Sequence, residues 1–172
     1  MRNLEIVSWF EYSAVIHADL GENASSGVWK RSQKAGIFRP MATLRVLIAD
    51  DHAGIRRSLR SLVLSHREWD VCGEAADGVQ AVERAKELHP DLILMDVSMP
   101  RMNGIEAASK IHREFPKTEI LIVTQYDTPE MARLVEEAGA EGYIPKSEIW
   151  NSLVPAIESA NRKRTSRGSH QL

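Results

Sequence analysis

The 172-residue chain carries 22 basic and 24 acidic side chains, and its net charge of -2 at pH 7 gives no overall field that favours nucleic acid or a membrane surface. Its single cysteine, Cys72, excludes an intramolecular disulfide and a cysteine-rich metal site, and the apolar run around it indicates a buried structural thiol. No apolar run approaches the ~20 residues of a membrane helix, and the first residues lack a secretory signal pattern, so we expect a cytoplasmic protein.

The first 40 residues differ from the rest of the chain. Residues 1–40 show no sustained period of 2 or 3.6, and we expect a poorly ordered amino-terminal extension. Met41 then opens a strand-like segment that needs nothing upstream. One hypothesis is that Met41 is the real start and that the first 40 residues are an artefact of the assigned start. A genuine extension that docks on the domain or on a partner is the other hypothesis. We take residues 41–164 as the folded domain and residues 165–172 as a short tail.

From Leu44 onward, short apolar runs alternate with amphipathic helical patterns. This alternation is typical of βαβ units and a parallel sheet. The predicted strands are residues 44–49, 69–76, 91–95, 119–123 and 141–145.

The predicted helices carry start and stop signals. Asp77 and Asn103 each stand three residues before an amide or carboxylate side chain, the spacing of a capping box. Thr128 followed by Pro129 supplies an N-cap and a favourable first residue, and Gly139 suits the far end of the same helix.

Two helices show a clear apolar stripe that predicts their core face. These stripes are Ile55, Leu59, Leu62 and Val63 in the first helix and Ile149, Leu153 and Ile157 in the last. Pro155 falls inside the last helix, where it lacks a backbone donor and clashes with the preceding turn, so we predict a kink or a late helix start. The basic side chains that end this helix favour its dipole, and we expect no direct nucleic-acid partner.

Reactive side chains follow the predicted strands at the points where they end. Asp50 and Asp51 follow the first strand, Asp96 the third, Thr124 the fourth and Lys146 the fifth. Because the ligand crevice of an open parallel sheet lies beyond the carboxyl ends of its strands, we expect these residues to converge. Three carboxylates, a hydroxyl and an ammonium predict a pocket for magnesium and a phosphoryl group.

The chain resembles the receiver domain of two-component response regulators from Leu44 to about residue 162. The resemblance rests on the order and spacing of four motifs, IADDH at 48–52, LMDVSMPRMNG at 94–104, VTQYD at 123–127 and GYIPKS at 142–147. The amino-acid sequence around the first two motifs is most similar to the nitrate-response branch of the family. The resemblance implies an α/β, flavodoxin-like, doubly wound five-stranded parallel sheet with strand order 2-1-3-4-5 and helices on both faces.

The resemblance also implies a role for each acidic residue. Asp96 matches the phosphoacceptor, which would take a phosphoryl group from a sensor histidine kinase or a phosphotransfer protein. Asp51 and Asp96 would bind Mg²⁺ directly, Ser98 through its backbone carbonyl, and Asp50 through water. Oxygen ligands and retained waters are what Mg²⁺ prefers.

Three further positions match the part of the family pattern that senses the phosphoryl group. Lys146 would pair with Asp96 before phosphorylation and with phosphoryl oxygens afterwards. Thr124 would donate its hydroxyl to the phosphoryl group, and Tyr143 would turn inward as the switch. The alternatives are a solvated lysine, a threonine that caps the next turn and a half-buried core tyrosine.

Two departures from the family pattern bear on function. Gln125 stands where the family commonly has Ala or Gly, which leaves the lifetime of the phosphorylated form open. No helix-turn-helix output domain follows the last predicted helix before Leu172. We therefore expect a stand-alone receiver that is no enzyme beyond its own phosphoryl transfer and acts through a downstream protein partner. Dimerisation through the last strand and helix stays open.

Two other functional classes remain as alternatives. The first is a DNA-binding transcription regulator whose output domain is missing from the chain. The second is a magnesium-dependent phosphatase with an aspartyl nucleophile, although the Asp-x-Asp spacing of such enzymes is absent after the first strand.

Overall fold

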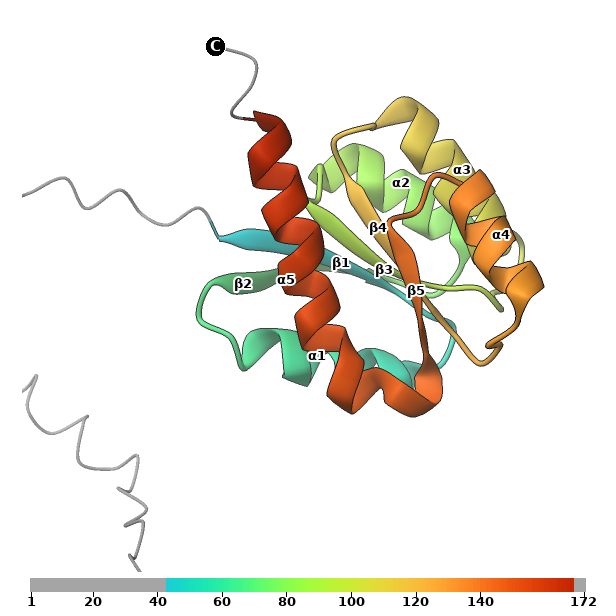
Figure 1. Cartoon of the computed structure of the whole chain (residues 1–172), viewed down its shortest axis with the longest axis horizontal. Coiled ribbons are helices and arrows are strands. Elements are labelled where there is room, and N and C mark those ends of the chain that lie inside the picture. The colour runs from blue at the N-terminus through green and yellow to red at the C-terminus, as the bar shows by residue number, and fades with distance from the viewer. Residues whose placement is uncertain (1–42, 169–172) are drawn as a thin grey trace, which may run out of the picture. The chain divides into compact units, whose positions relative to one another are not determined.

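The computed structural model describes residues 43–168, and the predictions for residues 1–40 and Met41 lie outside this range. Strands and helices alternate throughout this part of the chain (Figure 1). The strands are β1 (Leu44–Ala49), β2 (Trp69–Ala75), β3 (Leu92–Asp96), β4 (Glu119–Thr124) and β5 (Gly142–Pro145). The helices are α1 (Ala53–Leu64), α2 (Gly78–Leu88), α3 (Gly104–Glu114), α4 (Pro129–Glu137), the 3-10 turn η1 (Lys146–Glu148) and α5 (Ile149–Gly168). Each predicted strand end agrees with the structure to within one residue.

The strands form one parallel sheet in the order β2-β1-β3-β4-β5, which confirms the predicted fold class. The chain reverses its direction of travel across the sheet between β1 and β3, and this switch point opens a crevice beyond the strands' carboxyl ends. The β1–β3 register pairs Ala49 with Met95, so the next residues, Asp50 and Asp96, enter the crevice side by side.

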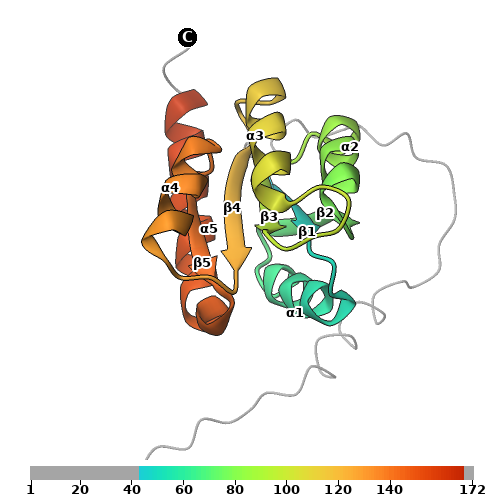
Figure 2. The same cartoon turned by 90° about the vertical axis from the view of Figure 1, so that its right-hand side faces the viewer.

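Alternate strand residues build two apolar layers, one on each face of the sheet. On one face, Leu47 of β1 and Ile93 of β3 pack against α2, α3 and α4. On the other, Val46 and Leu94 pack against α1 and α5, and α5 crosses in front of the strands in Figure 1. Helices α2 and α3 lie side by side (Figure 2). Cys72 is half-buried at the edge of the first layer, and burial raises the pKa of its thiol.

The predicted N-cap residues of three helices accept hydrogen bonds from the first turns. Asp77 accepts a hydrogen bond from the Gln80 backbone N–H at 2.9 Å, and Asn103 and Thr128 cap α3 and α4 in the same way. The Gln80 side chain bonds the N–H of Ala76 instead of the N-cap N–H, so this capping box is displaced by one residue. Gly139 has a φ of 75° and closes α4, where bonds from Gly139 and Ala140 to the last turn form a Schellman motif.

The two predicted apolar stripes face the core. Leu59 and Val63 of α1, like Leu153 and Ile157 of α5, are almost fully buried. Helix α5 nevertheless begins at Ile149 and runs through Pro155, so the predicted late start is wrong. The packing of Ile149 and Leu153 against the sheet holds the turns before the proline in helical form. A kink at Pro155 stays a prediction.

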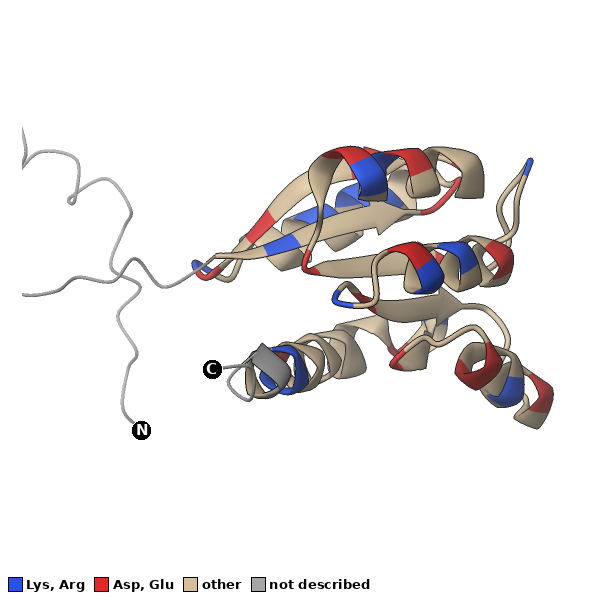
Figure 3. Cartoon of the chain, turned by 90° about the horizontal axis from the view of Figure 1, so that it is seen from above, with Lys and Arg blue, Asp and Glu red and all other residues tan. Residues whose placement is uncertain are grey.

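Charges are mixed over the surface. Figure 3 shows acidic and basic positions close together on the same helices. The near-equal numbers of acidic and basic residues in the whole sequence are therefore also found on individual helices. The cations near the end of α5 have acidic partners, because Arg162 pairs with Glu158, Lys163 with Glu141 and Arg164 with Asp91. In the part of the chain that the structure describes, none of the helices is both long and apolar enough for a bilayer crossing.

Gly104 is required by the close approach of α3 to the end of β3. Its N–H bonds the Val97 carbonyl at 2.9 Å, and a Cβ at this position would lie 1.9 Å from the backbone oxygen of Asp96. Any side chain would therefore push the first turn of α3 away from the strand end that carries Asp96.

We expect Gly104→Ala to lower the free energy of unfolding by roughly 1 to 3 kcal/mol, the usual range for overpacking a close contact. Chemical denaturation of both proteins measures the change. Gly54→Ala is the matched control, because a Cβ on Gly54 meets no atom within 4 Å and alanine favours a helix. Equal stability of Gly104→Ala and the parent chain would contradict the assigned contact.

Candidate functional site

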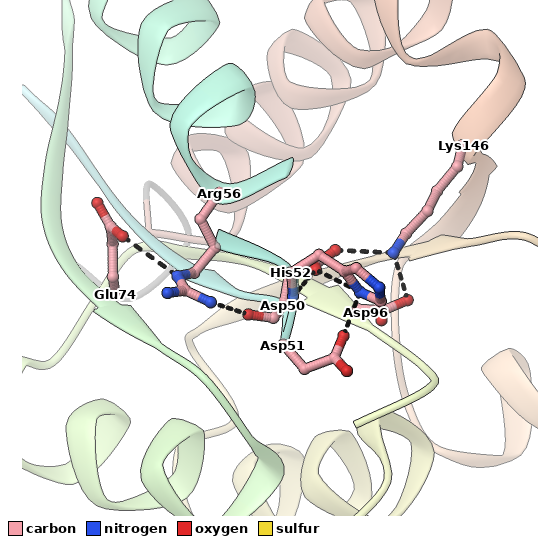
Figure 4. Close-up of polar contacts among 7 residues, drawn as sticks. All are labelled: Asp50, Asp51, His52, Arg56, Glu74, Asp96 and Lys146. Atoms are coloured by element: carbon pink, nitrogen blue, oxygen red, sulfur yellow. Dashed lines mark hydrogen bonds and ion pairs between the residues drawn. The ribbon is translucent and has the colours of Figure 1, made fainter. Parts of the chain in front are cut away.

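One ammonium group joins two buried carboxylates at the switch point of the sheet. The Nζ atom of Lys146 lies 2.8 Å from Oδ2 of Asp50 and 3.1 Å from Oδ1 of Asp96 (Figure 4). The side chains of Asp50 and Asp96 are only 1% and 3% exposed, and that of Lys146 is 12% exposed. The predicted convergence of the strand ends therefore brings these three residues together, and we call their cluster the acidic pocket.

The strand register explains why these residues meet. Asp50 and Asp96 follow paired residues of β1 and β3, while Thr124 ends β4 opposite Pro145 of β5. Lys146 is the next residue, so its long side chain starts at the far edge of the crevice and reaches past β4 to the two carboxylates.

Burial and charge change the proton affinities in this pocket. Burial raises the pKa of the Asp96 carboxyl above its usual range; Lys146 opposes this increase and Asp50 adds to it. Burial alone would lower the pKa of Lys146, but its bonds to Asp50 and Asp96 outweigh that effect and raise it. Lys146 is therefore a fixed cation, whereas Asp96 carries its negative charge at an energetic cost.

Asp51 directly follows Asp50 and is more exposed than the acidic pocket, with His52 beside it. Its side chain is 31% exposed, and its Oδ1 atom lies 2.7 Å from Nδ1 of His52. Asp50, Asp51 and His52 each offer one ligand atom within 4.8 Å of the others. Sequence reasoning did not assign a role to His52, although it directly follows the acidic pair and its backbone N–H bonds Asp50 at 2.8 Å.

Arg56 is a second contact that the sequence did not reveal. Its guanidinium bonds the backbone carbonyl of Asp50 at 2.6 Å and lies 3.4 Å from the carboxylate of Glu74 (Figure 4). Arg56 therefore holds the Asp50 backbone against β2. Its only signal in the sequence is a position one turn after His52 on α1, which is too common to be specific.

Thr124 and Tyr143 each have a partner in the loop between β4 and α4. Thr124 is fully buried, and its Oγ1 accepts a hydrogen bond from the Tyr126 backbone N–H at 3.1 Å, so it caps the turn after β4. Its hydroxyl proton remains available to another acceptor. The Tyr143 hydroxyl donates to Asp127 at 2.8 Å while its ring packs at the edge of the core. Thr124 therefore caps the next turn and Tyr143 is a half-buried core tyrosine, as the two alternative interpretations of the sequence expected.

Ser98 and Gln125, the remaining candidate residues, follow the ends of β3 and β4. Ser98 is exposed two residues after Asp96, and its backbone N–H is directed to the Asp96 carboxylate. Gln125 is exposed directly after Thr124. The carboxylates of Asp50, Asp51 and Asp96 exceed the single ammonium in charge, and oxygen-rich, negatively charged pockets suit a hard divalent cation such as Mg²⁺. The residues present therefore fit a magnesium ion.

Comparison with known proteins decides the family. The response regulator receiver domain matches residues 46–158 of the chain. The chain belongs to this family. Receiver domains are phosphoacceptors that bind Mg²⁺ at an acidic pocket and interact with histidine kinases and phosphotransfer proteins.

Individual relatives refine this membership. The chain is 42% identical to transcriptional regulatory protein YxjL of Bacillus subtilis over 69% of its own length and 55% of that protein. It is 39% identical to oxygen regulatory protein NreC of Staphylococcus aureus over 71% and 57% of the two chains. The receiver thus spans about half the length of these curated relatives, and the nitrate-response branch is confirmed.

A solved structure supports the same assignment. A LuxR-family two-component response regulator from Aurantimonas is 37% identical, with a TM-score of 0.65 over 68% of this chain and 84% of that chain. Sequence motifs and backbone geometry therefore agree on a receiver domain.

Lys146→Met tests whether the ammonium stabilises the acidic pocket. Removing one partner from a buried ion pair costs about 3 to 5 kcal/mol, and we expect a loss of this size in the free energy of unfolding without added metal. Chemical denaturation measures it. Lys163→Met is the control, because the Lys163 ion pair with Glu141 is largely exposed on the lysine side and should change stability by less than about 1 kcal/mol. Similar losses in both variants would contradict a special role for Lys146.

The Tyr143 bond to Asp127 predicts an altered titration. This hydrogen bond, with lesser contributions from burial and neighbouring charge, raises the pKa of the Tyr143 phenol. The bond stabilises the fold below the ordinary tyrosine pKa and is lost as the pH rises through the raised value. We expect Asp127→Asn to lower the pKa of Tyr143, as measured by near-ultraviolet absorbance against pH. Subtracting the Tyr143→Phe curve isolates this residue, and an unchanged midpoint would refute the contact.

Proposed function

We propose that Asp96 accepts a phosphoryl group from a histidine kinase or a phosphotransfer protein in a phosphorelay. The observation that carries this proposal is the geometry of Asp96, a buried carboxylate at a strand end, 3.1 Å from a lysine ammonium. A carboxylate and a phosphoryl group repel each other, so the reaction needs positive charge at both. Lys146 supplies one such charge.

Magnesium would supply the second charge in this proposal. Asp51 and Asp96 would bind the ion directly, Ser98 through its carbonyl oxygen and Asp50 through water. When bound, the cation neutralises the oxygens of the transferred group and orients them toward the nucleophile. Asp50 is held for this task by Arg56 and by the His52 N–H, and Lys146 orients Asp96.

Attachment of the phosphoryl group would change two contacts of the loop between β4 and α4. Thr124 would donate its free hydroxyl proton to a phosphoryl oxygen, and Tyr143 would leave Asp127 and turn inward. Phosphorylation would thereby add negative charge and hydrogen-bond acceptors beside this loop, which would have two alternative conformations. The face formed by α4, β5 and α5 would report this change.

A downstream protein is the partner we propose for that face. Trp150 on α5 is 67% exposed, and aromatic side chains are enriched where proteins meet. In this function the receiver acts in the cytoplasm, without direct contact to nucleic acid. A homodimer through the same region stays a hypothesis.

A second candidate function follows from the relatives. YxjL is named a transcriptional regulatory protein, and the receiver matches 55% of its length. In this case a DNA-binding domain joined to the receiver would be the output. The mass of the protein isolated from its native cells separates the two functions, because an output domain would raise it well above 19.3 kDa.

Intact-mass analysis after incubation with acetyl phosphate tests the chemistry. We expect one phosphoryl adduct in the parent chain with magnesium and none with a chelator. Asp96→Asn should abolish it, because the amide is a near isostere without a nucleophilic charge. Asp91→Asn is the matched control, since Asp91 lies at the opposite end of β3. An adduct that persists in Asp96→Asn at another residue would refute the assignment.

A further inference from the structure

Arg101 lies in a backbone conformation that arginine rarely adopts. Its φ is 65°, and within residues 43–168 only one other non-glycine residue, His89, has a positive φ. The left-handed region disfavours side chains that carry a Cβ, so neighbouring contacts must maintain it. Arg101 belongs to the loop between β3 and α3, five residues after Asp96.

Two contacts hold this conformation: the Met102 N–H bonds the Pro100 carbonyl at 2.7 Å across Arg101, and the Arg101 side chain forms an ion pair with Asp77. The guanidinium of Arg101 bonds Oδ2 of Asp77, whose side chain is 5% exposed, while Oδ1 of the same carboxylate caps the Gln80 N–H of α2. Although burial opposes its charge, the bonds to Arg101 and to backbone N–H groups lower the pKa of Asp77. The carboxylate is therefore a fixed anion at the start of α2.

The loop backbone is attached to α2 at the next residue as well. The Gly78 N–H bonds the Met102 carbonyl at 3.2 Å, and a Cβ on Gly78 would lie 2.3 Å from that oxygen. Just after the loop, Gly104 is fixed against Asp96 and Val97, where the loop begins. Ser98, which the proposed function uses as a magnesium ligand, lies between the attached residues Val97 and Met102.

We propose that the Arg101–Asp77 ion pair positions the loop between β3 and α3 for cation binding. Arg101 touches neither Asp96 nor the cation in this proposal, and it is a positioning residue that acts through the backbone of residues 97–103. The proposal rests on the proposed function, because it concerns the same magnesium site. It assigns α2, which contributes no ligand, a part in setting the affinity of that site.

The expected effect is a change in magnesium affinity that stability does not explain. Groups that orient metal ligands typically alter affinity by about tenfold or more, and we expect Arg101→Ala to raise the dissociation constant for Mg²⁺ by about tenfold. Asp77→Asn should act similarly, since its Oδ1 still caps α2 while its charge is lost. The double variant should be no worse than either single variant, because both remove the same contact.

Titration calorimetry of the full chain with Mg²⁺ alone measures this affinity. Phosphorylation by acetyl phosphate provides a second reading, in which the magnesium concentration for half-maximal rate should rise while the rate at saturating magnesium stays near that of the parent chain. Arg101→Lys keeps a cation and should restore most of the affinity.

Two further variants separate positioning from stability. Arg101→Gly removes the ion pair but also the strain of the positive φ, so it should weaken magnesium binding without lowering thermal stability. Arg84→Ala is the matched control, because the Arg84 side chain is 52% exposed, close to the 54% of Arg101, and its ion pair lies wholly within α2. It should bind magnesium like the parent chain.

The outcomes distinguish this proposal from the proposed function. Unchanged magnesium affinity in Arg101→Ala and Asp77→Asn, with binding by the parent chain, overturns the positioning role alone. Equal weakening in Arg84→Ala overturns it too, since the effect would then be one of surface charge. A parent chain that binds no magnesium overturns both proposals.

Discussion

The Lys146 ammonium is the interaction on which the rest of the pocket depends. Two carboxylates as buried as Asp50 and Asp96 repel each other and are poorly solvated, and one cation within 3.1 Å of both offsets part of that cost. It does not offset all of it, because the Asp96 pKa is still raised. The receiver therefore has uncompensated negative charge at the switch point, which a divalent cation would neutralise.

Most of the fold could be predicted because its signals are local. Alternating apolar runs, capping residues such as Asp77 and Thr128, and Gly139 at a helix end all act within a few residues of the chain. The convergence of Asp50, Asp96 and Lys146 could be predicted too, because strand ends meet by the geometry of a parallel sheet. The start of α5 could not, since packing against the sheet outweighs the local effect of Pro155.

Contacts that depend on the path of a loop could not be predicted from the sequence. The His52 ring beside Asp51, the Arg56 bond to the Asp50 carbonyl and the ion pair of Arg101 all depend on where one loop meets another element. Single arginine and histidine residues carry no periodic pattern that marks such meetings. The residues that bear the chemistry were therefore predictable, whereas those that hold them in position were not.

The ion pair of Arg164 with Asp91 means that β3 is bonded to the same helical segment at both of its ends. Asp91 directly precedes the strand and Asp96 ends it, and these two residues bond Arg164 and Lys146, which lie near opposite ends of the continuous segment formed by η1 and α5. The segment formed by η1 and α5 therefore holds an ion pair at each end of the strand. Displacement of β3 along its axis relative to α5 would therefore lengthen one ion pair or the other.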